Sequence, residues 1–117
     1  MVFTYDKRGV GESGGVYAGP EVGTNLMRMV GISVQRKSRS RQVIGTNEKL
    51  TPYEALKAIT IWSAYQHFEE HTKGTLEEGK LADMVILDKN PLKVSEDVIK
   101  EIVVIETIKE GVSVYTK

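Results

Sequence analysis

The segment LTPYEALKAITIWSAYQHFEE, residues 50–70, constrains the fold of this chain more than any other stretch. Thr51 is a good N-cap residue, Pro52 falls at the first helical position, and Glu54 stands three residues after the cap. Together they form a capping box, which satisfies backbone amide groups that a helix start otherwise leaves unpaired. The pattern predicts a helix from Pro52 to about His71, with Gly74 as its stop signal.

The polar residues of this predicted helix occupy only a narrow stripe, and the rest of its circumference is apolar. The apolar members are Ala55, Leu56, Ala58, Ile59, Ile61, Trp62, Ala64, Tyr65 and Phe68. A helix that is apolar over most of its circumference is usually covered by other elements on several sides. Because the rest of the chain supplies few such neighbours, we expect a partner or self-association through the exposed apolar helix face.

Turn residues and apolar periodicity predict the other elements. Before the long helix, we expect a strand at residues 2–5, a glycine-rich loop at 9–23, a helix at 25–35 capped by Thr24 or Asn25, and a basic connection at 36–42. After it, we expect a strand at 84–87 and a helical turn or two after Ser95. Two further strands, at 103–108 and 112–115, should flank a turn at Gly111. The mixture predicts an α+β fold.

Composition narrows the functional classes. The 117 residues hold 16 basic and 16 acidic side chains and no cysteine. Balanced charge argues against nucleic acid or anionic lipid as partners, and the basic run RKSRSRQ then reads as a solvated loop rather than a phosphate-binding arm. The absence of cysteine excludes disulfides and thiolate chemistry. No apolar run approaches the roughly 20 residues that span a bilayer. We expect a cytoplasmic protein without a membrane partner.

A formal G-x-S-x-G at Gly11, Ser13 and Gly15 raises the possibility of a serine nucleophile. In serine hydrolases this turn lies directly between a strand and a helix. Here five residues separate the predicted strand from Gly11, and the glycine-rich stretch after Gly15 does not predict a helix. The local context therefore disfavours Ser13 as a nucleophile.

The segment GTLEEGKL, residues 74–81, spells G-x-x-x-x-G-K but ends in Leu81, where a phosphate loop requires Ser or Thr. It also follows a predicted helix and leads into a strand, whereas a phosphate loop follows a strand and opens a helix. The pattern disfavours nucleotide binding.

The segment HFEEH, residues 67–71, is a formal H-x-x-E-H. Two histidines four residues apart on a helix can bind zinc, with the intervening glutamate as a base. His67, Glu70 and His71 are therefore zinc candidates. The alternative interpretation, which we favour, is that both histidines are polar residues near a helix C-terminus, where positive charge is favourable.

Two resemblances to known families exist. FTYDKRGVGESGG, residues 3–15, resembles an α/β-hydrolase loop that lies beside the active site, in which the matching residues are structural. A much longer resemblance begins at residue 25. TPxEAL before the apolar helix, GxLxxGKxADMVILD at 74–88 and VxxTIxxG at 104–111 resemble the C-terminal end of the amidohydrolase superfamily, in the branch that includes formamide deformylases and N-acyl deacylases.

This resemblance implies a fragment of a metal-bearing (β/α)8 barrel joined to a composite β-sandwich. It divides the chain into a head of uncertain origin at 1–24, late barrel helices at 25–73 and the C-terminal sandwich portion at 74–117. Gly79 and Lys80 would form a turn that Asp83 anchors, which makes these residues structural rather than catalytic.

The family's metal ligands lie upstream of the matched region, and its late aspartate belongs to a Ser-Asp-x-Pro segment. The corresponding stretch here, GVYAGPEVG, keeps Pro20 but has no aspartate. No catalytic, cofactor-binding or metal-binding residue can therefore be transferred to this chain. The parent enzyme would use a divalent metal, with zinc expected, on a small amide-type substrate with a non-peptide C–N bond. We expect this chain alone to bind no cofactor and to be inactive. A serine hydrolase and a non-enzymatic α+β interaction module are the alternative functions.

Overall fold

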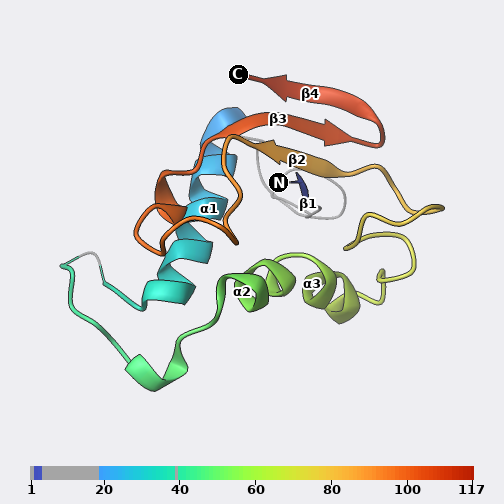
Figure 1. The fold of residues 1–117 in the computed structure, drawn as a ribbon. Coiled ribbons are helices and arrows are strands. Elements are labelled where there is room, and N and C mark those ends of the chain that lie inside the picture. The colour runs from blue at the N-terminus through green and yellow to red at the C-terminus, as the bar shows by residue number, and fades with distance from the viewer. Residues whose placement is uncertain (1, 4–18, 39) are drawn as a thin grey trace.

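The computed structural model describes residues 2–3, 19–38 and 40–117 of the chain. Its four-stranded antiparallel sheet has the order β1-β2-β3-β4. The strands are β1 (Val2–Phe3), β2 (Met84–Leu87), β3 (Val104–Lys109) and β4 (Val112–Thr116). In Figure 1, α2 and α3 run below this sheet and α1 crosses steeply beside it. The α+β class predicted from the sequence is confirmed for this part of the chain.

Helix α1 (Gly19–Gln35) begins earlier than the sequence predicts. Thr24 and Asn25 lie inside the helix rather than capping it, and the predicted loop is wrong over its last residues, 19–23. Pro20 is compatible with this start, because a proline in the first turn loses no intrahelical hydrogen bond. The remainder of the predicted loop, residues 9–18, and residues 4–5 of the predicted first strand lie outside the described residues.

The long helix predicted from Pro52 to about His71 is two helices, α2 (Pro52–Ala58) and α3 (Ile61–Gln66). The capping box is confirmed: the Glu54 amide donates to Thr51 Oγ1 and the Thr51 amide donates to Glu54 Oε2. The break falls at Thr60, whose hydroxyl donates to the Leu56 carbonyl oxygen at 2.7 Å. Such a side-chain bond to the previous turn competes with helix continuation.

The second half of the chain follows the sequence-based prediction closely. Strand β2 has the predicted bounds, and β3 and β4 differ from prediction by one residue at one or both ends. Glu110 and Gly111 have φ of 50° and 81°, so the β3–β4 turn uses the left-handed conformation that glycine favours. The helical turn predicted after Ser95 is the 3-10 helix η2 (Ile99–Glu101), and another, η1 (Thr46–Glu48), precedes α2.

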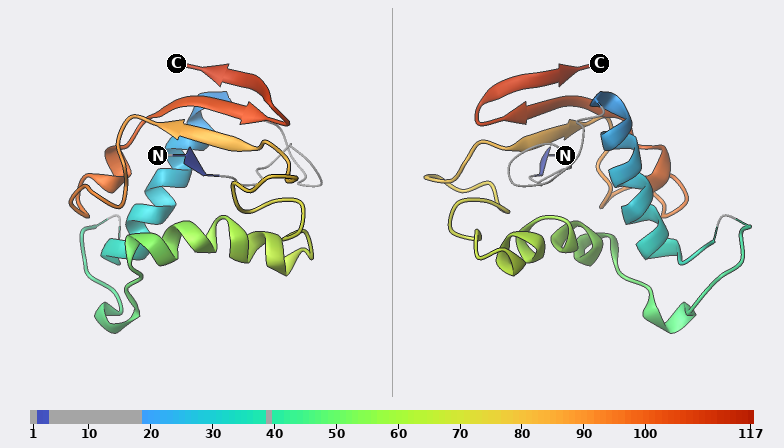
Figure 2. Two further views of the ribbon diagram at one scale, coloured as in Figure 1. Left: turned by 45° about the vertical axis from the view of Figure 1, so that its right-hand side comes forward. Right: turned by 180° about the vertical axis from the view of Figure 1, so that it is seen from behind.

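One apolar core joins α1, α2, η2 and the sheet. Its buried members are Met27, Val30, Val34, Ala55, Leu56, Val85, Leu87, Ile99, Ile102 and Val104. The views in Figure 2 show α1 and the η2 segment side by side at one end of the molecule. None of the described helices combines the length and apolar character that crossing a membrane requires.

Candidate functional site

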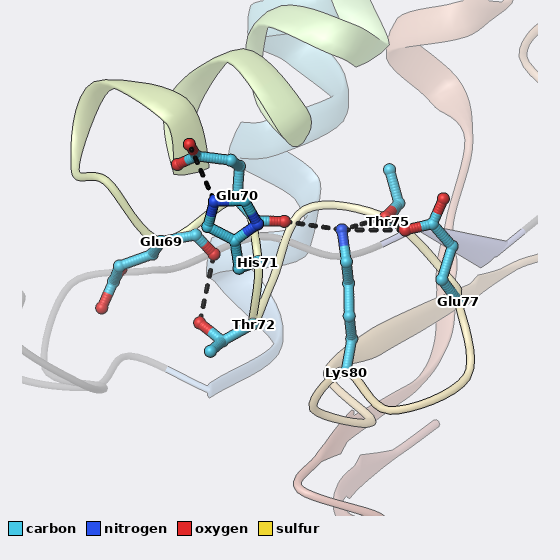
Figure 3. Close-up of polar contacts among 7 residues, drawn as sticks. All are labelled: Glu69, Glu70, His71, Thr72, Thr75, Glu77 and Lys80. Atoms are coloured by element: carbon cyan, nitrogen blue, oxygen red, sulfur yellow. Dashed lines mark hydrogen bonds and ion pairs between the residues drawn. The ribbon is translucent and has the colours of Figure 1, made fainter.

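The Lys80 ammonium group is held by a loop that precedes it (Figure 3). Its Nζ donates to the Glu70 carbonyl oxygen at 2.6 Å and to Thr75 Oγ1 at 2.7 Å, and it lies 2.9 Å from Glu77 Oε2. The Lys80 side chain is only 13% exposed. Since a lysine ammonium has three N–H donors, these three oxygens satisfy it completely. The arrangement suits a structural cation rather than a base or nucleophile.

Backbone hydrogen bonds close the same loop. The Leu81 amide donates to the Thr72 carbonyl oxygen at 2.9 Å, and the Lys80 amide donates to the Glu77 carbonyl oxygen at 3.2 Å. Gly74 has φ of 92°, and a Cβ atom there would lie 2.9 Å from Ala64 Cβ and 2.9 Å from Ile61 Cα. Only glycine allows the loop to approach α3 this closely.

Asp83 was expected to anchor the Gly79–Lys80 turn, but its carboxylate contacts the β3–β4 turn instead. Its Oδ1 accepts a hydrogen bond from the Glu110 amide at 2.7 Å, and its Oδ2 lies 3.8 Å from Lys109 Nζ. The Gly111 amide donates to the Ala82 carbonyl oxygen at 3.1 Å. The carboxylate therefore holds the β3–β4 turn against the residues that lead into β2. Lys80 and Asp83 attach the start of β2 to two segments that lie far from each other in sequence.

Two exposed carboxylates in these networks have lowered pKa values. Hydrogen bonding from the Lys80 ammonium, followed by that from Thr75, lowers the pKa of Glu77 below its usual value of 4.5. In the capping box, the Thr51 backbone amide and then the Thr51 hydroxyl lower the pKa of Glu54. In both cases hydrogen bonds to the ionised carboxylate favour the charged form.

The H-x-x-E-H segment does not have the helical geometry that its zinc interpretation requires. Helix α3 ends at Gln66, His67 is its C-cap, and Phe68 has φ of 56°. His67 and His71 therefore do not share a helix face. His71 is 90% exposed, and its Nε2 lies 3.7 Å from Glu70 Oε1. Within the described ranges, no three His, Cys, Asp or Glu side chains are grouped so that they could hold a metal ion.

The structure describes the residues of the G-x-x-x-x-G-K pattern but not those of the G-x-S-x-G pattern. The G-x-x-x-x-G-K segment lies in the connection from α3 to β2, as predicted, so no helix start follows Lys80. Lys80 instead donates its hydrogen bonds within its own loop. Ser13 lies outside the described residues, so its role as a nucleophile stays untested.

A set of aromatic side chains, here called the aromatic surface, lies on α2, on α3 and just after α3, and Trp62, Tyr65 and Phe68 are among the apolar residues that the sequence predicts for this segment. Its members are exposed: Tyr53, Trp62, Tyr65 and Phe68. Lys57 Nζ lies 5.3 Å from the centre of the Tyr53 ring and 5.2 Å from that of Trp62, within cation–π range. The sequence analysis does not predict this lysine contact.

Comparison with known proteins shows the family to which this chain belongs. The model of the Amidohydrolase family matches residues 17–115. The chain belongs to this family. An N-substituted formamide deformylase from Arthrobacter pascens is 28% identical over 85 residues, which are 73% of this chain and 16% of the deformylase. The amidohydrolase resemblance expected from the sequence is thus confirmed.

A solved structure is also similar to this amidohydrolase chain. It is an amidohydrolase from Thermotoga maritima MSB8, with 25% sequence identity and a TM-score of 0.51. The match covers 61% of this chain and 17% of the Thermotoga protein. The chain therefore spans about one sixth of the length of each of these two relatives.

Proposed function

We propose that this chain is the C-terminal portion of an amidohydrolase that cleaves non-peptide C–N bonds in small amide-type molecules. The family match over residues 17–115 carries the proposal. The similarity to a formamide deformylase supports an amide or formamide as the substrate class. A cytoplasmic location remains part of the proposal, since the chain has no cysteine for disulfides.

Within that enzyme, the described residues supply structure rather than chemistry. Lys80 has all its donors satisfied by its own loop, and Asp83 holds the β3–β4 turn. These are the two charged residues of the Gly-Lys-x-Ala-Asp element that resembles the family. Their role is to fix the point at which the chain passes from α3 into the sheet.

The divalent metal expected of the family does not fit the described residues. The two histidines lie beyond the end of α3, and no group of three potential ligands is present there. We infer that the metal and the residues that activate water belong to a portion of the enzyme outside this segment. No reaction step is assigned to His67, Glu70 or His71.

The aromatic surface of α2 and α3 supports contact with the rest of the enzyme. Phe68 is 88% exposed and Tyr65 is 65% exposed. Lys57 lies over both the Tyr53 and the Trp62 rings, so these two exposed rings are near each other, and contiguous exposed apolar patches mark interaction sites. On this proposal they pack against the remaining polypeptide, and self-association of the isolated chain is a consequence of leaving them uncovered.

The alternatives receive less support. The family match begins at residue 17, after Ser13, so it does not extend to the serine-hydrolase pattern. A non-enzymatic interaction module explains the aromatic surface but not the amidohydrolase resemblance of the Gly-Lys-x-Ala-Asp element.

The size of the polypeptide in its source cells tests the proposal. An antibody against residues 70–117 should detect a protein several times larger than 13.0 kDa. The coding sequence upstream of this segment should encode a barrel in which one strand carries a His-x-His motif. A product of 13.0 kDa alone, encoded without any upstream barrel, would contradict the proposal.

A further inference from the structure

A cleft of about 760 Å³ lies between α1, the residues Lys37, Ser38 and Arg41 that follow it, and η2. Its lining residues are Arg28, Gly31, Ile32, Gln35, Lys37, Ser38, Arg41, Lys100 and Glu101. Four of these side chains are cationic and one is acidic, although the whole chain has no net charge. The volume lies within the range of small-molecule sites. The lining of this cleft therefore carries a local excess of positive charge.

One face of α1 forms the floor of this cleft. Arg28, Ile32 and Gln35 follow helical spacing, so they lie on the same side of the helix. Gly31 lies between them, and a Cβ atom at this position would be 3.2 Å from Lys100 Cβ. The absence of a side chain at Gly31 lets η2 pack directly on the helix, which brings Lys100 over the same face as Arg28.

Hydrogen bonds set the cleft wall before any ligand arrives. The buried Gln35 side chain donates to the Glu96 carbonyl oxygen at 2.8 Å and to Asp97 Oδ1 at 2.9 Å. Lys37 Nζ lies 3.6 Å from Asp97 Oδ1 on the other side. Asp97 thus joins the end of α1, the basic loop and the segment before η2.

Three of the cations remain available to a ligand. Among the described residues, none forms an ion pair with Arg28, Arg41 or Lys100. The three come from three separate segments that line the cleft, so together they offer three positive charges, which suits a ligand that carries several negative charges. Arginine in particular binds phosphate oxygens through two parallel N–H donors.

We propose that this cleft binds a small molecule carrying two or more phosphate groups, with Arg28, Arg41 and Lys100 contacting the anionic groups. Glu101, on the rim, opposes an anion and limits the affinity. The proposal does not depend on the hydrolase function, because none of these residues takes part in the networks of Lys80 or Asp83.

Titration calorimetry of the full chain with tripolyphosphate at low ionic strength tests this site. We expect one-site binding that weakens as salt is added. The double variant Arg28→Gln/Arg41→Gln should weaken binding by about tenfold or more, since it removes two charge-assisted contacts. The matched control Lys89→Gln/Lys93→Gln removes the same charge from exposed positions outside the cleft and should change the affinity by less than about twofold.

Glu101→Gln provides an independent test in the opposite direction. Removing this rim carboxylate should strengthen binding several-fold, a gain that a damaged fold cannot produce. Citrate, which carries carboxylates in place of phosphates, should bind more weakly than tripolyphosphate. The proposal is overturned by absence of tripolyphosphate binding, by equal losses in the two double variants, by no gain in Glu101→Gln, or by equal affinity for citrate.

Discussion

Lys80 Nζ donates a hydrogen bond of 2.6 Å to the carbonyl oxygen of Glu70, ten residues earlier in the chain. This contact crosses the base of the loop that connects α3 to β2. Thr75 and Glu77, which complete the coordination of the ammonium, lie within that loop. A single side chain thereby organises the passage from the helical part of the chain to the sheet.

Lys80→Met should lower the free energy of unfolding by about 2 kcal/mol, because it leaves partly buried oxygens without their donor. Lys89→Met, at an exposed position, should change it by less than about 0.5 kcal/mol. Urea denaturation of both variants measures the difference. Equal effects of the two substitutions would show that Lys80 does not organise the loop.

Gly74 and Gly79 form a matched pair for the close approach of the loop to α3. Both have positive φ, but a Cβ atom would collide with Ala64 and Ile61 only at Gly74, and would meet no atom within 4 Å at Gly79. Gly79→Ala should cost about 1–2 kcal/mol for the left-handed backbone alone. Gly74→Ala should cost more by at least about 1 kcal/mol, since the contact adds overpacking strain. Thermal unfolding of the two variants separates the backbone strain, present in both, from the overpacking strain, present only in Gly74→Ala. Equal losses of stability in the two variants would show that the close contact at Gly74 is absent.

Stability should depend on pH through Glu77. Its pKa in the folded protein is lowered, first by hydrogen bonding from Lys80 and then by that from Thr75. The carboxylate therefore stabilises the fold above its unfolded pKa, near 4.5, and this contribution disappears as the pH falls through the lower folded value. Glu77→Gln should flatten the pH dependence of unfolding below about pH 4.5. The Glu54 capping box remains in both proteins, so an unchanged pH profile would contradict the role of Glu77.

Phe68 occupies a left-handed position after α3, with φ of 56°, and is 88% exposed. In the isolated chain, Phe68→Gly should raise the unfolding free energy by about 1 kcal/mol, because glycine adopts this backbone without strain. It should also reduce any self-association measured by sedimentation. Destabilisation of the size expected for a buried phenylalanine would show that this side chain is covered within the chain itself.

Much of the fold could be predicted where local chemistry decides the structure. The capping box at Thr51 and Glu54 determines the start of α2, and the Gly111 turn determines the β3–β4 hairpin. The break at Thr60 was missed because its hydroxyl competes locally with a helix that the apolar pattern alone extends. The early start of α1 was missed because the glycine-rich composition suggested a loop.

The site could be predicted in part. The structural role of Lys80 and Asp83 was expected from a family resemblance, but their partners could not be, since Glu70 offers a backbone oxygen and Glu110 a backbone amide. The cleft around Arg28 and Lys100 depends on tertiary packing of segments some 70 residues apart. No local pattern connects these two positions.

The central claim is that this segment supplies structure to an amidohydrolase and not its reaction centre. The most direct measurement combines metal analysis of the purified chain with an assay of N-substituted formamide hydrolysis in the presence of added zinc. We predict no stoichiometric metal and no turnover above background. Stoichiometric zinc together with turnover that is lost in His67→Ala or His71→Ala would contradict the account.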